Sequence, residues 1–232
     1  MRNLPLPLQA LGTSPQRPPT FPLAALLILA LTGCASYSAK PLETRQEASS
    51  IIEQREAEGL YVAVKDLSNP RDSLQYFDRD LLEYGYVPVL LLLELDRNSQ
   101  TSFDVRREDI QLCLRDGKRL LSTDPHAVAE RVSFSHFRSA MGFLLLFPGF
   151  FLASSVNNAN DELEIDYQLK TMKSVRINPN MRSFRAVMFF QVPQDHRESF
   201  TMEDAFIEMK IYKQGQGGAI GKCLEFPIHF GK

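Results

Sequence analysis

The sequence predicts a mainly β protein, an antiparallel β-sandwich with helical additions. About seven β-rich stretches follow one another with glycine and proline between them, which is typical of two packed sheets. Two of these stretches, residues 86–95 and 184–192, are apolar at nearly every position. A strand with one face in water alternates apolar and polar residues, so both faces of these two strands must be covered. The long apolar insertion between them is the candidate cover.

An apolar run near the N-terminus ends in a cysteine. Arg2 and Arg17 are the only charged residues before Cys34. The apolar core, residues 21–31, is shorter than the roughly 20 residues that a membrane span needs, and a basic region before such a core has the form of a secretory signal. The tetrapeptide Leu31-Thr32-Gly33-Cys34, which closes the run, resembles the lipobox of bacterial lipoproteins.

The lipobox resemblance implies a defined modification. The Cys34 thiol receives a diacylglyceryl group, the chain is cut between Gly33 and Cys34, and the new amino group is acylated, with palmitate as a typical chain. Several acyl chains anchor a protein stably where one holds it only marginally. Residues 1–33 are then a signal peptide and residues 34–40 a spacer. The other interpretation is an unmodified cysteine that closes a cleaved signal or a short buried helix.

The residue after Cys34 bears on localisation. In many Gram-negative bacteria an Asp at this position retains a lipoprotein in the inner membrane, and this chain has Ala35 instead. The resemblance therefore implies the periplasmic face of the outer membrane, with the inner membrane as the alternative.

Residues 41–59 are predicted to form an amphipathic helix. Pro41 suits a first helical turn, residues 42–58 carry a narrow apolar stripe that ends at Ala57, and Gly59 stands where a C-terminal cap belongs. We expect the helix to lie on its own domain, and the alternative is a stalk that binds a partner.

The β-sandwich domain is assigned to residues 60–232. Ser68-Asn69-Pro70 ends its first strand, residues 74–84 are a short helix or connector, and Asp116-Gly117 supplies a hairpin turn. Besides the two apolar strands, the predicted strands are residues 60–67, 110–115, 118–121, 205–212 and 222–230. A loop with four glycines, residues 214–221, joins the last two.

Residues 124–176 are predicted to be a helical insertion between the two apolar strands. Asp124-Pro125 begins one helix, to about residue 137, and a second helix is expected from 157 to 175. Between them lies an apolar segment, residues 140–155, which Pro148-Gly149 interrupts.

Three interpretations of residues 140–155 are open. The segment is a hairpin packed on the outer face of the sheet, or a wedge that enters a membrane surface or a partner's groove, or a transmembrane helix, which its length opposes. The wedge would make its apolar contacts through Phe143, Phe147, Phe150 and Phe151.

Chemical signals beyond Cys34 are few. Cys113 and Cys223 lie on the polar phase of their strands, and two alternatives are open, a disulfide or two free thiols; a disulfide needs Cα atoms within about 7 Å. The histidines lack metal-ligand spacing, and no G-x-S-x-G element is present. We predict no catalytic residue, metal or cofactor, and the formal net charge of −2 offers no basis for nucleic-acid binding.

The domain has one further resemblance. The residues that carry it are Tyr76-Phe77, Gly85-Tyr86-Val87-Pro88-Val89, Asn160, Asp166-Tyr167 and Phe189-Phe190. In these features the chain is similar to uncharacterised bacterial lipoproteins with an immunoglobulin-like sandwich. This resemblance implies a fold and no activity, because the sandwich serves many roles.

We therefore expect a non-enzymatic binding or assembly module, tethered to the membrane through the lipid on Cys34, with an envelope protein as its partner. The first alternative is a protein that inserts residues 140–155 into a membrane or a partner. The second is an envelope enzyme without a recognisable motif.

Overall fold

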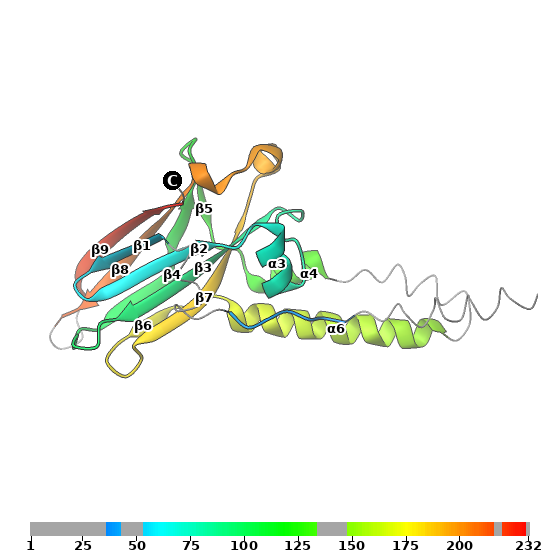
Figure 1. Ribbon diagram of the computed structural model, residues 1–232, viewed down its shortest axis with the longest axis horizontal. Helices are drawn as coiled ribbons and strands as arrows, with labels where there is room; N and C mark the ends of the chain where they lie inside the picture. Colours follow the sequence, from blue (N-terminus) through cyan, green and yellow to red (C-terminus); the bar gives the residue numbers. More distant parts are fainter. Residues whose placement is uncertain (1–35, 43–52, 134–147, 216–219, 231–232) are drawn as a thin grey trace, which may run out of the picture. The chain divides into compact units, whose positions relative to one another are not determined.

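The computed structural model describes residues 36–42, 53–133, 148–215 and 220–230 (Figure 1). For residues 53–55, 148–155, 196, 198–199, 204 and 220–221 it describes the backbone alone. The described chain is mainly β, with two antiparallel sheets and three α-helices, as the sequence predicts. The leader, residues 1–33, and Cys34 lie outside the described residues.

Within each of the two sheets, neighbouring strands run antiparallel. In spatial order, sheet A consists of β1 (Glu53–Ala57), β2 (Leu60–Asp66), β3 (Tyr86–Leu95) and β7 (Ser183–Gln191). Sheet B consists of β5 (Arg119–Leu121), β4 (Phe103–Cys113), β8 (Phe206–Gln214) and β9 (Ile220–His229), with β6 (Val175–Ile177) also paired to β4. Two short 3-10 helices, η1 (Gln194–Ser199) and η2 (Met202–Asp204), lead from β7 to β8.

The helix predicted over residues 41–59 is wrong at both ends that the structure describes, because residues 41–42 are not helical and residues 53–57 are a strand. Residues 53–57 form β1, which pairs with β2 from Glu53↔Val64 to Ala57↔Leu60. Glu58 and Gly59, with φ of 54° and 80°, make the two-residue turn between them. Positive φ at both turn positions matches the right-handed twist of a hairpin. Pairing with a buried strand has overridden the helical propensity of a Glu- and Arg-rich sequence.

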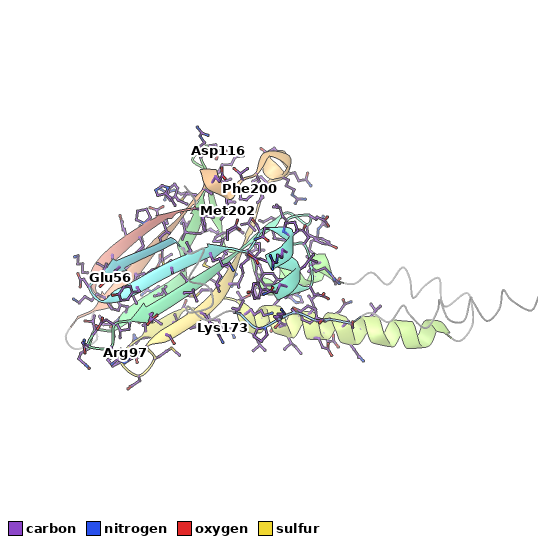
Figure 2. All side chains as sticks on the ribbon, viewed as in Figure 1. Glu56, Arg97, Asp116, Lys173, Phe200 and Met202 are labelled. Atoms are coloured by element: carbon purple, nitrogen blue, oxygen red, sulfur yellow. The ribbon has the colours of Figure 1, made fainter. Side chains whose placement is uncertain are left out.

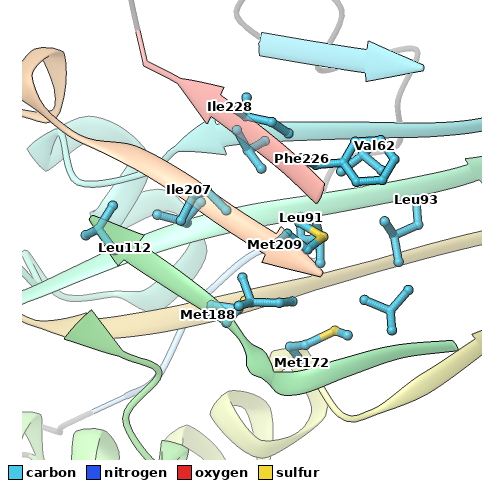
Figure 3. Close-up of a cluster of buried hydrophobic side chains, with 14 of the residues drawn as sticks. Val62, Leu91, Leu93, Leu112, Met172, Met188, Ile207, Met209, Phe226 and Ile228 are labelled. Atoms are coloured by element: carbon cyan, nitrogen blue, oxygen red, sulfur yellow. The ribbon is translucent and has the colours of Figure 1, made fainter. Parts of the chain in front are cut away.

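The core between the sheets takes one side of each strand. Figure 3 shows Val62, Leu91 and Leu93 of sheet A meeting Met209 and Phe226 of sheet B, and all five are buried. Only about half of the apolar side chains of β3 and β7 lie in this core between the sheets.

The other half faces a second core, on the outer side of sheet A. Helices α3 (Pro70–Phe77), α4 (Pro125–Val132) and α6 (Pro148–Lys170) cover this face. Phe189 of β7 lies 5.5 Å, between ring centroids, from both Phe77 of α3 and Tyr167 of α6. The prediction that both faces of β3 and β7 are covered is therefore confirmed.

The cover differs in part from the one expected. It consists of α3, α4 and residues 156–170 of α6. Residues 140–147, and the side chains of residues 148–155, lie outside the described part. The second helix of the insertion begins at Pro148, not at residue 157, and ends at Lys170, not at residue 175. Pro148 begins a helix without penalty because the first turn needs no N–H from it.

The start of α4 agrees with the prediction, and Asp124 caps it by accepting a hydrogen bond from the His126 N–H at 2.8 Å. The start of α3 differs, because residues 68–70 are predicted to be a turn and a short helix or connector only over residues 74–84. The helix begins at Pro70 instead, where Asn69 caps it by accepting a hydrogen bond from the Asp72 N–H at 2.9 Å. No helix among the described residues has the length and hydropathy that crossing a membrane requires.

The free edge of β7 is closed by the two ends of the insertion. The Thr123 N–H donates to Phe189 O at 2.7 Å, and the Met172 N–H donates to Val187 O at 2.8 Å. These bonds satisfy an edge that would otherwise be open to pairing. They also fix where the insertion leaves the sheet and returns to it.

Candidate functional site

The segment that follows the predicted lipid site is docked on the domain. We call residues 36–42 the N-terminal arm. Its Leu42 is buried, and the Lys40 N–H donates to Gln75 O of α3 at 2.9 Å. The spacer predicted at residues 34–40 is thus, from residue 36 on, a packed segment. Cys34 and Gly33 lie outside the described residues, so lipidation of Cys34 stays a prediction.

Tyr37 is the arm's main contact with α6. Its ring lies edge-on to Tyr167, with ring centroids 6.5 Å apart, and its hydroxyl donates to Asp166 Oδ2. Burial, together with the carboxylate of Asp166, raises the pKa of Tyr37 above its ordinary value. The hydroxyl therefore remains protonated and keeps its role as a donor.

Lys170 joins this contact to α3. Its Nζ donates to Asp166 Oδ2 at 2.5 Å and to Tyr76 O at 2.6 Å. The side chain is buried, and burial lowers the pKa of Lys170, although the hydrogen bond with Asp166 opposes this effect. We call Tyr37, Asp166 and Lys170 the arm junction. Its hydrogen bonds hold the arm, α3 and α6 together.

The arm junction was missed by sequence reasoning. Asp166 and Lys170 stand at i,i+4 on one helix, a spacing that predicts an ion pair. Nothing local marks Tyr37, which is 129 residues from its partner Asp166. The contact follows from tertiary packing alone.

The apolar segment is described only by backbone, and only at its end. Phe143 and Phe147 lie outside the described residues, while Phe150 and Phe151 belong to the start of α6 and their side chains are outside the description. The apolar contact predicted for these four residues stays a prediction. Further along α6, Ile165 and Leu169 are 58% and 75% exposed and stand four residues apart, on one face.

The disulfide alternative for Cys113 and Cys223 is wrong in this fold, and both thiols are free. Cys113 stands opposite Phe206 of β8, whereas Cys223 stands opposite Tyr212. These positions on β8 are roughly 20 Å apart along the strand, well beyond the reach of a disulfide. Burial, with a contribution from Glu208, raises the pKa of the Cys113 thiol, which disfavours a reactive thiolate.

The two histidines whose side chains the structure describes take structural positions. His126 Nδ1 lies 2.9 Å from Glu164 Oε1, linking α4 to α6, and His229 packs against Phe206 with 4.9 Å between ring centroids and 33° between the ring planes. Among the described residues, no three potential metal ligands gather at one place.

A cleft of about 610 Å³ opens where β7 ends. We call it the arginine cleft. Its described lining residues are Tyr86, Arg131, Gln191, Val192, Pro193, Gln194 and Arg197. They come from the start of β3, the last turn of α4, the end of β7 and η1. The lining brings together two cationic side chains and two amides, none of which carries a marked motif in the sequence.

No family model, curated protein or solved structure matches this chain.

Proposed function

We propose that the protein is a lipid-anchored binding or assembly module of the bacterial envelope, tethered through Cys34 at the periplasmic face of the outer membrane. The lipobox-like Leu31-Thr32-Gly33-Cys34 is the origin of the proposal. The observation that carries it further is the docked arm. After cleavage, only Cys34 and Ala35 would separate the lipid from Ser36, an extended length of about 7 Å.

A short tether has a physical consequence. A long flexible linker lets a domain sample many orientations, whereas two residues and a docked arm hold it close to the bilayer in a narrow range of orientations. The arm junction would then fix the orientation of α3, α6 and sheet A relative to the lipid anchor. A module that presents one face to a partner in the envelope gains from such a constraint because less orientational freedom is lost on binding.

The sandwich fold is compatible with a binding role and does not identify a reaction. We propose that its topology is immunoglobulin-like: β2-β3-β7 corresponds to the A-B-E order of that fold, and β9-β8-β4 to G-F-C. Such sandwiches commonly bind through loops and faces, and fold alone assigns no chemistry.

Lipidation is tested by labelling cells with an alkyne analogue of palmitate. We expect label on the wild-type protein and none on Cys34→Ser, with the wild type in the outer-membrane fraction of a density gradient. Cys223→Ser is the matched control because Cys223 is an exposed thiol outside the predicted lipobox. Label that persists in Cys34→Ser, or a wild type without label, would refute the proposal.

A second candidate function is contact with the membrane surface. The observation in its favour is the exposed pair Ile165 and Leu169 on α6, the helix that also holds the arm. Two large apolar side chains on one helix face suit the boundary between headgroups and acyl chains.

The chain contains no Trp, so a single introduced Trp reports this contact. In vesicles that hold the full protein, fluorescence of Leu169→Trp is expected to shift to the blue and to be quenched by brominated lipid. Lys210→Trp, at an exposed position on sheet B, is the control and is expected to remain unquenched. Equal quenching of the two variants, or none in either, would contradict membrane contact by α6.

A further inference from the structure

The arginine cleft has the composition of a binding site for anions. Arg131 and Arg197 line it from different elements, α4 and η1, and the amides Gln191 and Gln194 are the other polar side chains of the lining. No described carboxylate is among the lining residues. We propose that this cleft binds an oxyanion, a phosphate or carboxylate group, between Arg131 and Arg197.

Arg197 is held in place by the backbone beneath it. Gly85 has a φ of +83°, and a Cβ built there would come within 2.3 Å of the guanidinium carbon and Nε of Arg197. The guanidinium thus lies directly on the glycine backbone. Its Nε donates to Val192 O at 3.5 Å, and among the described residues neither terminal NH₂ group has a hydrogen-bond acceptor. A planar fork of donors fixed in this way suits the two oxygens of a carboxylate or phosphate.

Arg131 reaches the same cleft from the last turn of α4 and is exposed. Its structural alternative is a favourable interaction with the C-terminal end of the helix dipole. That role would show in stability, whereas a ligand-binding role would show in affinity. Two guanidinium groups on one cleft repel each other, and an oxyanion between them would remove the repulsion.

The cleft is large enough for a ligand bigger than a single inorganic ion. Small-molecule sites generally span about 300 to 1,000 Å³, and 610 Å³ falls within that range. Tyr86, Val192 and Pro193 add an apolar wall beside the polar groups. We therefore expect a ligand with one anionic group and a small organic body, supplied either by a soluble phosphate ester or by an anionic lipid headgroup.

The test follows the backbone amides of Val192 and Gln194 by NMR in the full protein, extracted in an uncharged detergent. Inorganic phosphate and glycerol phosphate are the soluble probes, titrated against chloride at equal ionic strength to cancel screening. Lipid discs of phosphatidylcholine with and without phosphatidylglycerol are the headgroup probe.

We expect saturable shifts with at least one probe, and binding weakened roughly tenfold or more by Arg131→Gln or Arg197→Gln, the loss typical of a charged hydrogen bond. Arg97→Gln is the matched control: Arg97 is exposed and lies at the far end of the sandwich from Phe200, the residue after η1 (Figure 2). The affinity of the Arg97→Gln variant for the probe should equal that of the wild type.

The pattern of response identifies the ligand source. Shifts with the soluble probes assign the site to a soluble anion, and shifts only in discs with phosphatidylglycerol assign it to a headgroup. No saturable shift with any probe overturns the proposal. So does Arg131→Gln or Arg197→Gln binding as tightly as wild type while its melting temperature is unchanged. Should Arg197→Gln fail to fold, Arg131→Gln alone decides, since that side chain is exposed.

Discussion

The outer faces of the two sheets have opposite character. On sheet A, Tyr86, Leu90 and Phe189 point outward and are buried under three helices. On sheet B, Lys210 and Glu225 point outward and are exposed. The strands of sheet A must therefore be apolar on both faces, whereas those of sheet B alternate.

The difference shows which face of the sandwich carries additional structural elements. The three described α-helices and the N-terminal arm lie on the side of sheet A, so the arm junction is built over a second core. Sheet B carries surface ion pairs instead, such as Arg119 Nη1 with Glu208 Oε2 at 3.0 Å. Exposed pairs of this kind contribute little to stability.

The largest expected effect comes from opening the second core. Phe189→Ala removes a fully buried ring that touches Phe77 and Tyr167, and should lower the free energy of unfolding by about 3 to 5 kcal/mol. Phe206→Ala is the matched change on the outer face of sheet B, where the half-buried ring meets only His229 among the described aromatic residues.

We expect Phe206→Ala to lose about 1 kcal/mol, because a partly exposed ring forfeits less burial. Chemical denaturation of the two variants measures the contrast. Equal losses would show that the outer side of sheet A is not a true second core.

An intermediate effect is expected at the arm junction. Lys170→Met keeps the aliphatic bulk but removes the donor to Asp166 and to Tyr76 O, which should cost about 1 to 3 kcal/mol. Lys173→Met, three residues on and exposed, should stay within about 0.5 kcal/mol of wild type (Figure 2). Thermal unfolding compares the two, and a Lys170 variant as stable as the Lys173 variant would contradict the junction.

The smallest effect is pH-dependent and isolates Tyr37. Its pKa is raised in the folded state, so the folded protein retains a proton that the unfolded chain loses above about pH 10. The contribution of Tyr37 is fully present below that pH and is lost as pH rises further. Tyr37→Phe should cost about 1 kcal/mol at neutral pH and reduce the fall in stability above pH 10.

Hydrogen exchange of the Lys40 amide, which donates to Gln75 O, reports whether the arm itself is released in Tyr37→Phe. Ser38→Ala, an exposed change in the arm, serves as the comparison. Identical pH profiles for Tyr37→Phe and the wild type would mean that Asp166 does not hold the Tyr37 hydroxyl.

Much of the fold was predictable from local pattern. The apolar runs of β3 and β7 indicate strands covered on both faces, and Asp124-Pro125 marks the start of α4 because capping and proline geometry act within one turn. Asp116-Gly117 predicts the turn that joins β4 to β5, and Gly117 has the φ of +87° that such a turn uses. These features depend on neighbours in sequence.

The errors occurred where pairing with another segment, and not the local pattern, decides. Residues 53–57 read as helix but pair with β2, and Cys113 and Cys223 share a polar phase but stand at opposite ends of β8. In the candidate sites, neither Tyr37 nor Arg197 carries a local signal. Their roles come from Asp166 and from Gly85, each more than 100 residues away.

The sequence by itself therefore determined the mainly β fold class and the turn at Asp116-Gly117, because periodicity and turn chemistry are local, and it predicts a lipid anchor at Cys34. Only the tertiary structure decided that the arm is docked, that α3, α4 and α6 cover sheet A, and that two arginines share one cleft. The physical reason is that these contacts form between segments far apart in the chain. Burial and hydrogen bonding select such contacts once the sheets have closed, and no short stretch of sequence specifies them alone.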